Sequence, residues 1–365
     1  MYFKSAPVLF TCVRTGMHSN LLFALLRVQI MKRTLKFLNL LVLLAMFLAA
    51  CAPATPLAPT ATPTLAEPTV TPTPLVPTAT PTSEPIVLPD GTGGEVSLPA
   101  PVQRIVSLAP SNTEILFAIG AGSQVVARED FSNYPEETQS LPSVGGNMGK
   151  YDLEKMVSLK PDLVLASPLT APEVLKGIQD LGLKVLVVPN PTTLAEMYAN
   201  LELVGKATGR EKEARELVNQ LQAREKKALE VAAKAASKPL VFYELDATDP
   251  AKPWTSGPGT FIDLLIGLAG GRNLGASLEG SWAQISQEEL IVQNPDIILL
   301  GDALYGGVTP EQVAQRPGWN AIKAVKENRV YPFNDDLVSR PGPRLVDGLV
   351  ELVKVFHPEL AGELK

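Results

Sequence analysis

The chain has 365 residues, a formal net charge of −6, 2 cysteines and 2 histidines. A charge this small provides no basic surface for a nucleic acid, so we expect no nucleic-acid partner. Of the histidines His18 and His357, only the second follows the leader described below, and we expect it to lie at a helix end. One histidine excludes a His-rich metal site and makes a Ser-His-Asp hydrolase depend on His357. The sequence also has no nucleophile elbow and no phosphate loop, so we expect no enzymatic activity, resident cofactor or metal.

Residues 31–50 have the pattern of a lipoprotein signal peptide, with the basic residues Lys32, Arg33 and Lys36 at its start. The apolar run over 37–48 is too short to span a bilayer, and small residues lead into Cys51. We expect cleavage before Cys51 and lipidation of its thiol, with an uncleaved anchor helix as the alternative. Because Met31 begins this pattern, residues 1–30 are interpreted as an upstream segment from a wrongly chosen start. The protein is then extracytoplasmic and lipid-anchored to the cell membrane.

Residues 51–89 are predicted to form a tether that begins at the lipidated cysteine. Residues 52–85 contain 10 prolines and 10 threonines among 34 positions, which cannot supply a core. Such a chain favours extended polyproline geometry of about 3.1 Å per residue, so its reach is on the order of 100 Å. We interpret it as a spacer that holds a folded part away from the membrane; the alternative is a low-complexity tail without a length requirement.

From Val102 onward, short apolar runs alternate with amphipathic stretches, which is typical of an α/β fold with buried parallel strands. The predicted strands are Arg104–Leu108, Asp162–Ala166, Lys184–Val188, Pro239–Tyr243, Asp296–Leu300 and Arg329–Phe333. A helix after Pro110 is expected to be capped by Ser111 or Asn112 and to end near Gly120.

An internal repeat relates residues 152–165 to residues 286–299 at an offset of 134. Each copy begins with a good helix N-cap, carries a glutamate two positions later and ends in Pro-Asp before a strand. The repeat predicts two similar lobes, here 90–209 and 239–365. Between them, residues 210–238 contain no glycine and no proline, and they predict one long connecting helix.

Five segments resemble the periplasmic-binding protein family for iron–siderophores and vitamin B12, most closely its B12-binding branch. They are 104–114, 152–162, 253–257, 281–288 and 341–344, and they span roughly residues 102–360. The resemblance implies two Rossmann-like lobes with parallel sheets, one long connecting helix and a ligand in the interlobe cleft. It also implies a monomer that captures cobalamin or a related corrinoid, a metal chelate, and delivers it to an ABC permease dimer with its ATPase subunits.

The resemblance further implies a docking role for Glu154 and Glu288, one on each lobe, against arginines of the permease dimer. The repeat identifies the same pair independently. The alternative is a carboxylate that stabilises the first turn of a helix through the helix dipole, by about 0.3–1 kcal/mol.

For the ligand, Trp254 in a turn-rich segment and Trp282 are expected to contact a flat apolar ring, with edge-of-core packing as the alternative. The other candidates, weaker or implied by the resemblance, are Phe131, Tyr134, Asp336 and Arg340, with Arg344 supporting its loop. The chain departs from the B12-binding branch where that branch has tryptophans: it offers Met148 or Asn147 at one position and Ser167 at the other. Met148 is suited to pack on an apolar ring.

Three alternative functions stay open at this point. An anionic ferric siderophore would use cations such as Arg128, Arg340 and Arg344. Haem, lacking a cleft histidine, would need an axial tyrosine such as Tyr134, Tyr151 or Tyr305. The third alternative is a sensory or scaffold lipoprotein that keeps the fold without transport.

Overall fold

The computed structural model describes residues 84–364. The predicted upstream segment 1–30, the predicted signal peptide 31–50, Cys51 and most of the predicted tether therefore lie outside the described residues. Within 84–364, no helix is long and apolar enough to cross a membrane. The last residues of the predicted tether, 86–89, form a strand, β1, which pairs with the next strand in a hairpin.

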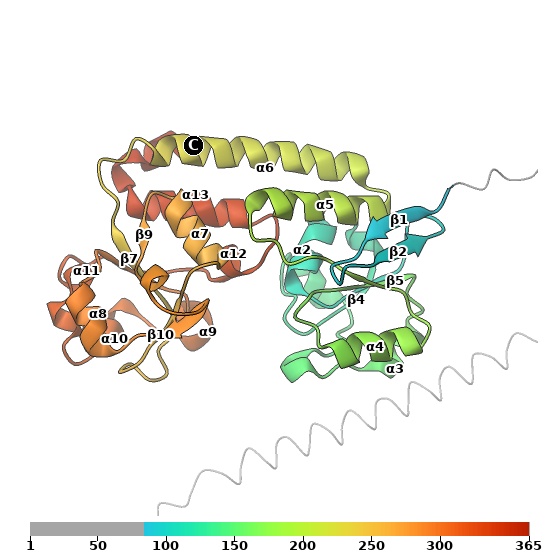
Figure 1. Cartoon of the computed structure of the whole chain (residues 1–365), viewed down its shortest axis with the longest axis horizontal. Helices are drawn as coiled ribbons and strands as arrows, with labels where there is room; N and C mark the ends of the chain where they lie inside the picture. Colours follow the sequence, from blue (N-terminus) through green and yellow to red (C-terminus); the bar gives the residue numbers. More distant parts are fainter. Residues whose placement is uncertain (1–83, 365) are drawn as a thin grey trace, which may run out of the picture. The chain divides into compact units, whose positions relative to one another are not determined.

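The N-terminal lobe (Figure 1) contains a four-stranded sheet. The sheet is parallel throughout, with the strand order β4-β3-β5-β6. Its strands and the hairpin are β1 (Ile86–Pro89), β2 (Glu95–Leu98), β3 (Ile105–Ser107), β4 (Val125–Arg128), β5 (Leu163–Ala166) and β6 (Val185–Val187). Its helices are α2 (Pro110–Ala118), α3 (Leu153–Ser158), α4 (Pro172–Asp180) and α5 (Leu194–Thr208), with short turns η1 (Gly122–Gln124), η2 (Glu136–Ser140) and η3 (Asn147–Gly149). The buried strands β3, β5 and β6 coincide with three of the predicted runs.

The predicted cap of the first helix is wrong. Helix α2 begins at Pro110 with Ala109 as its N-cap residue, and no side chain caps it. Proline suits this first position because its missing N–H would have no helical partner. Ser111 and Asn112 are instead buried inside the helix, and Asn112 Nδ2 donates to the carbonyl oxygen of Ala166 at 2.9 Å. The amide therefore ties α2 to the end of β5.

The second lobe has a six-stranded mixed sheet in the order β10-β8-β7-β11-β12, with β9 also pairing with β7. Its strands are β7 (Leu240–Asp246), β8 (Trp254–Ser256), β9 (Arg272–Asn273), β10 (Trp282–Gln284), β11 (Ile297–Leu300) and β12 (Val330–Pro332). Its helices are α7 (Phe261–Leu268), α8 (Gln287–Gln293), α9 (Ala303–Gly306), α10 (Pro310–Ala314), α11 (Lys323–Lys326), α12 (Asp336–Ser339) and α13 (Leu345–Phe356), with turns η4 (Leu274–Ser277), η5 (Trp319–Ala321) and η6 (Pro358–Leu364).

The expectation of parallel sheets holds for the first lobe, but the sheet of the second lobe is mixed. Strands β9, β7, β11 and β12 are parallel, but β8 is antiparallel to both β7 and β10. Only residues 247–253 join β7 to β8, too few for the crossover that a parallel neighbour requires. Trp254 consequently lies in a strand and not in the loop that its turn-rich surroundings predict.

The internal repeat has a physical basis in both lobes. The side chain of Asp152 accepts from the N–H of Lys155 and that of Ser286 accepts from the N–H of Glu289, so each caps its helix, α3 or α8. The Pro-Asp aspartates anchor neighbouring strands: Asp162 accepts from the N–H groups of Gln103 and Arg104 before β3, and Asp296 from that of Leu240 in β7.

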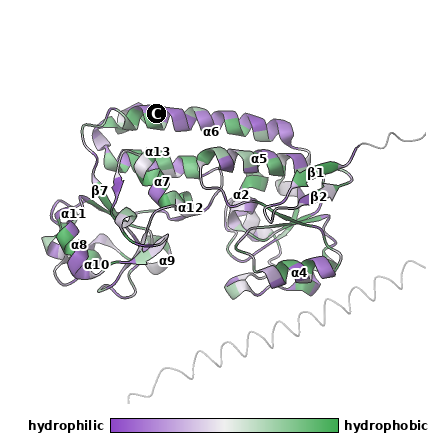
Figure 2. Cartoon of the chain, viewed as in Figure 1, coloured by the Kyte–Doolittle hydropathy of each residue, from purple (hydrophilic) through white to green (hydrophobic). Residues whose placement is uncertain are grey.

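One long helix, α6 (Glu211–Ala232), joins the two lobes, which confirms the predicted fold class. It packs against α5 from the first lobe and α13 from the second, and its buried stripe is Ala214, Val218, Leu221, Ala228, Val231 and Ala232. Much of the rest of its surface is hydrophilic (Figure 2). One core cluster runs through α2, α5, α6, α7 and α13, so the lobes share a core beneath α6 within one compact unit.

His357 ends α13 as predicted and is buried, with Nε2 3.1 Å from the carbonyl oxygen of Ala269.

Candidate ligand-binding cleft

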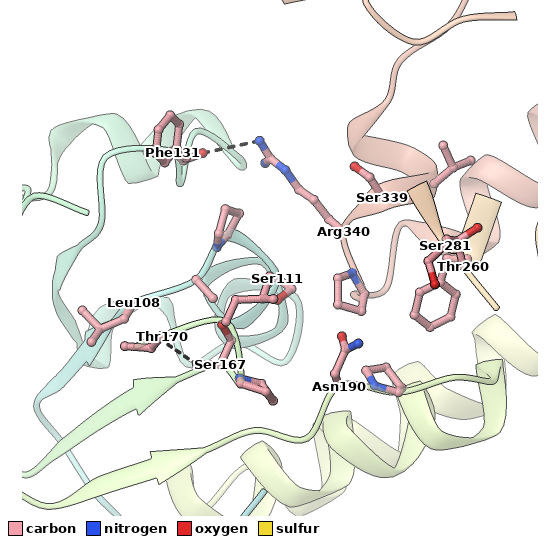
Figure 3. Close-up of a pocket in the computed structure, with 18 of the residues that line it drawn as sticks. Leu108, Ser111, Phe131, Ser167, Thr170, Asn190, Thr260, Ser281, Ser339 and Arg340 are labelled. Atoms are coloured by element: carbon pink, nitrogen blue, oxygen red, sulfur yellow. Dashed lines mark hydrogen bonds between the residues drawn. The ribbon is translucent and has the colours of Figure 1, made fainter. Parts of the chain in front are cut away.

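A cavity of about 530 Å³ is lined by residues from both lobes (Figure 3). All four parallel strands of the first lobe contribute residues at or shortly after their carboxyl ends. These are Leu108 after β3, Glu129 after β4, Ser167 after β5 and, slightly further on, Asn190 after β6. Ligands of open parallel sheets bind at this edge because the connecting loops diverge there and leave a crevice.

The wall from the second lobe is built differently. It consists of Ser281 and Trp282 from the β10 side of the sheet, the start of α7 at Thr260 and Phe261, and the connection from α12 to α13. Figure 3 shows Thr260, Ser281 and Ser339 on one side of the cavity and Leu108, Ser111 and Ser167 on the other. The starts of α2 and α7 both reach the cavity, so partly positive helix ends face it from both lobes.

The two tryptophans lie on one face of the β8–β10 ribbon. The register pairs Trp254 with Gln284 and Trp282 with Ser256, so the indoles are diagonal neighbours in an antiparallel pair. Diagonal positions of this kind are about 7–8 Å apart, within reach of aromatic side chains. Both indoles are partly exposed, Trp254 at 42% and Trp282 at 55%. Trp282 lines the cavity, and Trp254 does not.

A buried glutamate forms part of the cavity wall in the first lobe. Glu129 is only 3% exposed, and its Oε2 accepts from the N–H of Phe131 at 2.7 Å. Its Oε1 accepts from Ser132 Oγ at 2.6 Å, and that hydroxyl also bonds Thr113 Oγ1 at 2.7 Å. These bonds fix the backbone at Phe131, whose exposed ring lines the cavity.

An ion-pair network connects the lobes beside the cavity. Glu114 of α2 is buried, and Arg344 of the second lobe donates to it twice, from Nε to Oε2 at 2.8 Å and from Nη2 to Oε1 at 2.5 Å. Arg340 Nη1 is 3.1 Å from the same Oε1. Although burial opposes the charge of Arg344, its bonds with Glu114 raise the pKa of this arginine. The sequence positions of Glu114 and Arg344 gave no signal of this pairing, because 230 residues separate them.

Arg340 lines the cavity, but its Nη atoms are already occupied. Nη1 donates to Glu114 and to Asn133 Oδ1 at 2.8 Å, and Nη2 donates to the carbonyl oxygen of Phe131 and pairs with Asp336 at 2.8 Å. Arg340 therefore holds the 131–133 segment of the first lobe against the second.

The tyrosines proposed as metal ligands differ in their surroundings. Tyr151 lines the cavity, and burial together with the carboxylates of Glu129 and Asp130 raises its pKa. Tyr134 lies beneath the guanidinium of Arg344, 4.0 Å from the ring centroid. Tyr305 donates to the carbonyl oxygen of Leu245, and burial and Asp302 raise its pKa to about 12.

The structure brings only some of the predicted ligand residues to the cavity wall. Phe131, Trp282 and Arg340 line it, while Tyr134, Met148, Trp254 and Asp336 do not. Met148 is 87% exposed in the η3 turn. Of the positions that depart from the B12-binding branch, Ser167 lines the cavity. The sequence analysis did not identify Glu129 and Ser111 as wall residues. Ser111 lies shortly after the predicted strand β3, which is a position where ligands of parallel sheets bind, whereas Glu129 follows β4, which was not predicted.

Glu154 and Glu288 are both exposed and lie in the first turns of α3 and α8. These helices occupy the side of each lobe away from α6 (Figure 1), and neither glutamate lines the cavity. Both glutamates therefore lie outside the cleft interior, and each occupies the same position in its lobe, the exposed first turn of a helix.

Two α/β lobes joined by one helix, with a ligand-sized cavity between them, define a solute-binding protein. A family model described as periplasmic binding protein matches residues 105–337. An uncharacterized ABC transporter substrate-binding lipoprotein, YvrC, of Bacillus subtilis is 36% identical over 281 residues, covering 75% of this chain and 86% of that protein. The chain belongs to the periplasmic binding protein family, whose members are non-enzymatic solute-binding components of ABC transporters.

Other similar proteins differ in the ligand that their names state. A cobalamin-binding protein of Halobacterium salinarum is 26% identical, covering 87% of this chain and 84% of that protein. Among solved structures, the vitamin B12-binding protein of Vibrio cholerae (27% identity, TM-score 0.61) covers 72% of this chain and 98% of its own. A haem-binding protein of Roseiflexus (27%, 0.64) covers 72% and 99%, and a possible iron-binding protein of Staphylococcus epidermidis (32%, 0.62) covers 70% and 99%.

Proposed function

We propose that this protein is the extracytoplasmic, lipid-anchored binding protein of an ABC importer and that its ligand is cobalamin or a related corrinoid. The observation that carries the choice of ligand is the cavity wall, where Trp282 and Phe131 are accompanied mainly by uncharged polar groups. A corrin ring presents an apolar face to aromatic side chains, and its peripheral amides supply both hydrogen-bond donors and acceptors. Cobalamin-binding relatives support this proposal.

Amides suit the polar groups around this cavity. Their N–H groups match acceptors such as Glu129, and their carbonyl oxygens match the helix starts at Ser111 and Thr260. An anionic siderophore offers acceptors almost exclusively. Of the three arginines considered for it, Arg128 donates to the carbonyl oxygens of Thr138, Glu129 and Asp130, and Arg344 pairs with Glu114. Only Arg340 lines the cavity, with its Nη atoms occupied.

Haem is the less favoured ligand for a related reason. An axial tyrosine binds iron as a phenolate, and the surroundings of Tyr151 raise its pKa and so oppose that form. The other two candidate tyrosines, Tyr134 and Tyr305, do not line the cavity. A sensory or scaffold role without transport has no separate support in the site.

The ligand proposal is tested by tryptophan fluorescence. Cobalamin is expected to quench the emission of the wild-type protein on binding, since Trp282 would contact the ring. Trp282→Ala is expected to weaken binding by about 1–3 kcal/mol, the scale of removing an aromatic anchor at a binding site. Trp254→Ala is expected to have a smaller effect, because Trp254 adjoins Trp282 on the β8–β10 ribbon but does not line the cavity. Calorimetry with cobalamin, a ferric siderophore and haem provides the affinities.

The matched control is Val292→Ala, which removes an exposed apolar side chain on α8, outside the cavity wall. Its cobalamin affinity is expected to equal that of the wild type. If cobalamin does not bind at micromolar concentration while a ferric siderophore binds and depends on Arg340, the ligand assignment passes to the siderophore.

We propose further that Cys51 carries the lipid and that the Pro/Thr-rich tether separates it from the lobes. Cys51→Ser should release a folded, soluble protein, because residues 84–364 form their own core. Detergent phase partitioning of the mature protein measures the change. Retention of the Cys51→Ser protein in the membrane fraction would contradict the lipoprotein proposal.

A further inference from the structure

Few charged residues face the cavity. Among the described residues that line it, Glu129 is the only aspartate or glutamate and Arg340 the only lysine or arginine. The net charge that a ligand meets in the cleft therefore depends on whether each of these two side chains forms an ion pair with an oppositely charged side chain of the protein.

The positive charge of Arg340 is compensated within the protein. Arg340 and Arg344 share two carboxylates, Glu114 and Asp336, at distances from 2.5 to 3.7 Å. Two cations and two anions give this cluster no net charge. Since the Nη atoms of Arg340 also bond Asn133 and Phe131, little of its donor capacity remains for a ligand.

The negative charge of Glu129 is not compensated in this way. Both oxygens accept from neutral donors, the N–H of Phe131 and the hydroxyl of Ser132. Across residues 84–364, no lysine or arginine nitrogen forms an ion pair with it. The guanidinium of the adjacent Arg128 donates to the backbone carbonyl oxygens of Thr138, Glu129 and Asp130 and not to the Glu129 carboxylate. The wall of the cavity thus carries one buried, unpaired carboxylate.

We propose that Glu129 is a specificity-determining residue that makes the cleft select chelates with an uncharged, hydrogen-bond-donating periphery and reject chelates with an anionic one. The inference deepens the proposed function by naming the charge class of its ligand. Two like charges near each other in a partly dehydrated site repel far more than in water. One added negative charge on the ligand periphery is expected to cost on the order of tenfold in affinity.

The experiment compares ligands that share one ring and differ in charge. Cobalamin and its monocarboxylic derivative, in which one peripheral amide is hydrolysed, are titrated by calorimetry into the full mature protein and into Glu129→Gln. Wild-type protein should prefer cobalamin by about tenfold or more. In Glu129→Gln, affinity for the monocarboxylic derivative should rise, because the negative charge of the cavity wall is removed. Affinity for cobalamin should fall several-fold, because glutamine places an amide N–H where the Glu129 carboxylate would accept from a ligand amide.

The exposed Glu136, which does not line the cavity, supplies the matched control. Glu136→Gln makes the same change in net charge and should leave the preference for cobalamin intact. If Glu129 only positions the Phe131 backbone, Glu129→Gln will weaken both ligands by the same factor. That equal loss would overturn the proposal.

A second ligand pair separates this proposal from the choice of cobalamin. If cobalamin does not bind, an uncharged ferric trihydroxamate and an anionic ferric tricatecholate are compared in the same proteins. Preference for the trihydroxamate that narrows in Glu129→Gln supports charge selection and rejects only the corrinoid assignment. Preference for the tricatecholate in wild-type protein, or binding of none of the four chelates, overturns the role of Glu129.

Discussion

Charge reversal at both exposed glutamates, Glu154→Lys with Glu288→Lys, is expected to reduce ligand uptake at least tenfold while leaving ligand affinity within about twofold of the wild type. The physical reason is that one carboxylate on each lobe would meet arginines of a permease dimer, where like charges placed together cost several kcal/mol. Neither glutamate lines the cavity, so the ligand should not sense the change. Ligand-stimulated ATPase activity in a reconstituted transporter and calorimetric affinity measure the two effects separately.

Glu173 and Glu311 provide the controls for this experiment, one in each lobe. Both are first-turn acidic residues, of α4 and α10, and both are exposed. Reversing this control pair makes the same change in net charge and in helix-dipole interaction, and transport should remain near the wild-type level. Normal transport by the Glu154→Lys and Glu288→Lys protein would contradict the docking role, and equal losses in both pairs would assign the effect to net charge.

Removal of Glu114 is expected to cause the largest loss of stability, about 3–5 kcal/mol for Glu114→Ala. This carboxylate is buried and accepts from two arginines, so its loss leaves Arg340 and Arg344 with one shared carboxylate, Asp336, and a net positive charge in the interior. Urea denaturation followed by circular dichroism measures the free energy of unfolding. Because the network joins α2 of one lobe to the second lobe, the unfolding transition should be followed with probes in each lobe.

Arg224→Ala is the matched control, since Arg224 pairs with Asp347 at 2.6 Å but both side chains are well exposed. An exposed pair contributes only about 0–1 kcal/mol. The double substitution Glu114→Met with Arg344→Met should recover part of the lost stability. Replacing both partners of a buried ion pair with apolar side chains lowers the free energy of unfolding less than removing one partner does. A Glu114→Ala protein as stable as Arg224→Ala would show that the buried network contributes little.

Much of the architecture was readable from the chain because it depends on local patterns. The apolar runs at 163–166 and 297–300 predicted buried strands, and the caps Asp152 and Ser286 predicted the helices that precede them. The absence of glycine and proline over 210–238 predicted the connecting helix. These features follow from backbone preferences and from burial of whole segments, which a few neighbouring residues determine.

Other local expectations failed where a long-range contact competed with a local one. Asn112 has the chemistry of a helix cap, but the carbonyl oxygen of Ala166 takes its amide. Trp254 stands among turn residues, but pairing with β7 and β10 draws it into a strand. In both cases the competing partner lies in another element, so no pattern around the residue could reveal it.

By itself, the sequence determined the fold class and the family, because periodicity and motif order are properties of short segments. Only the tertiary structure decided which side chains share the cavity wall and how its charges are compensated. Glu114 meets Arg344 across 230 residues, and Glu129 is left without a cation although Arg128 precedes it directly. Compensation depends on distances of a few ångströms between distant segments, which packing of the two lobes sets.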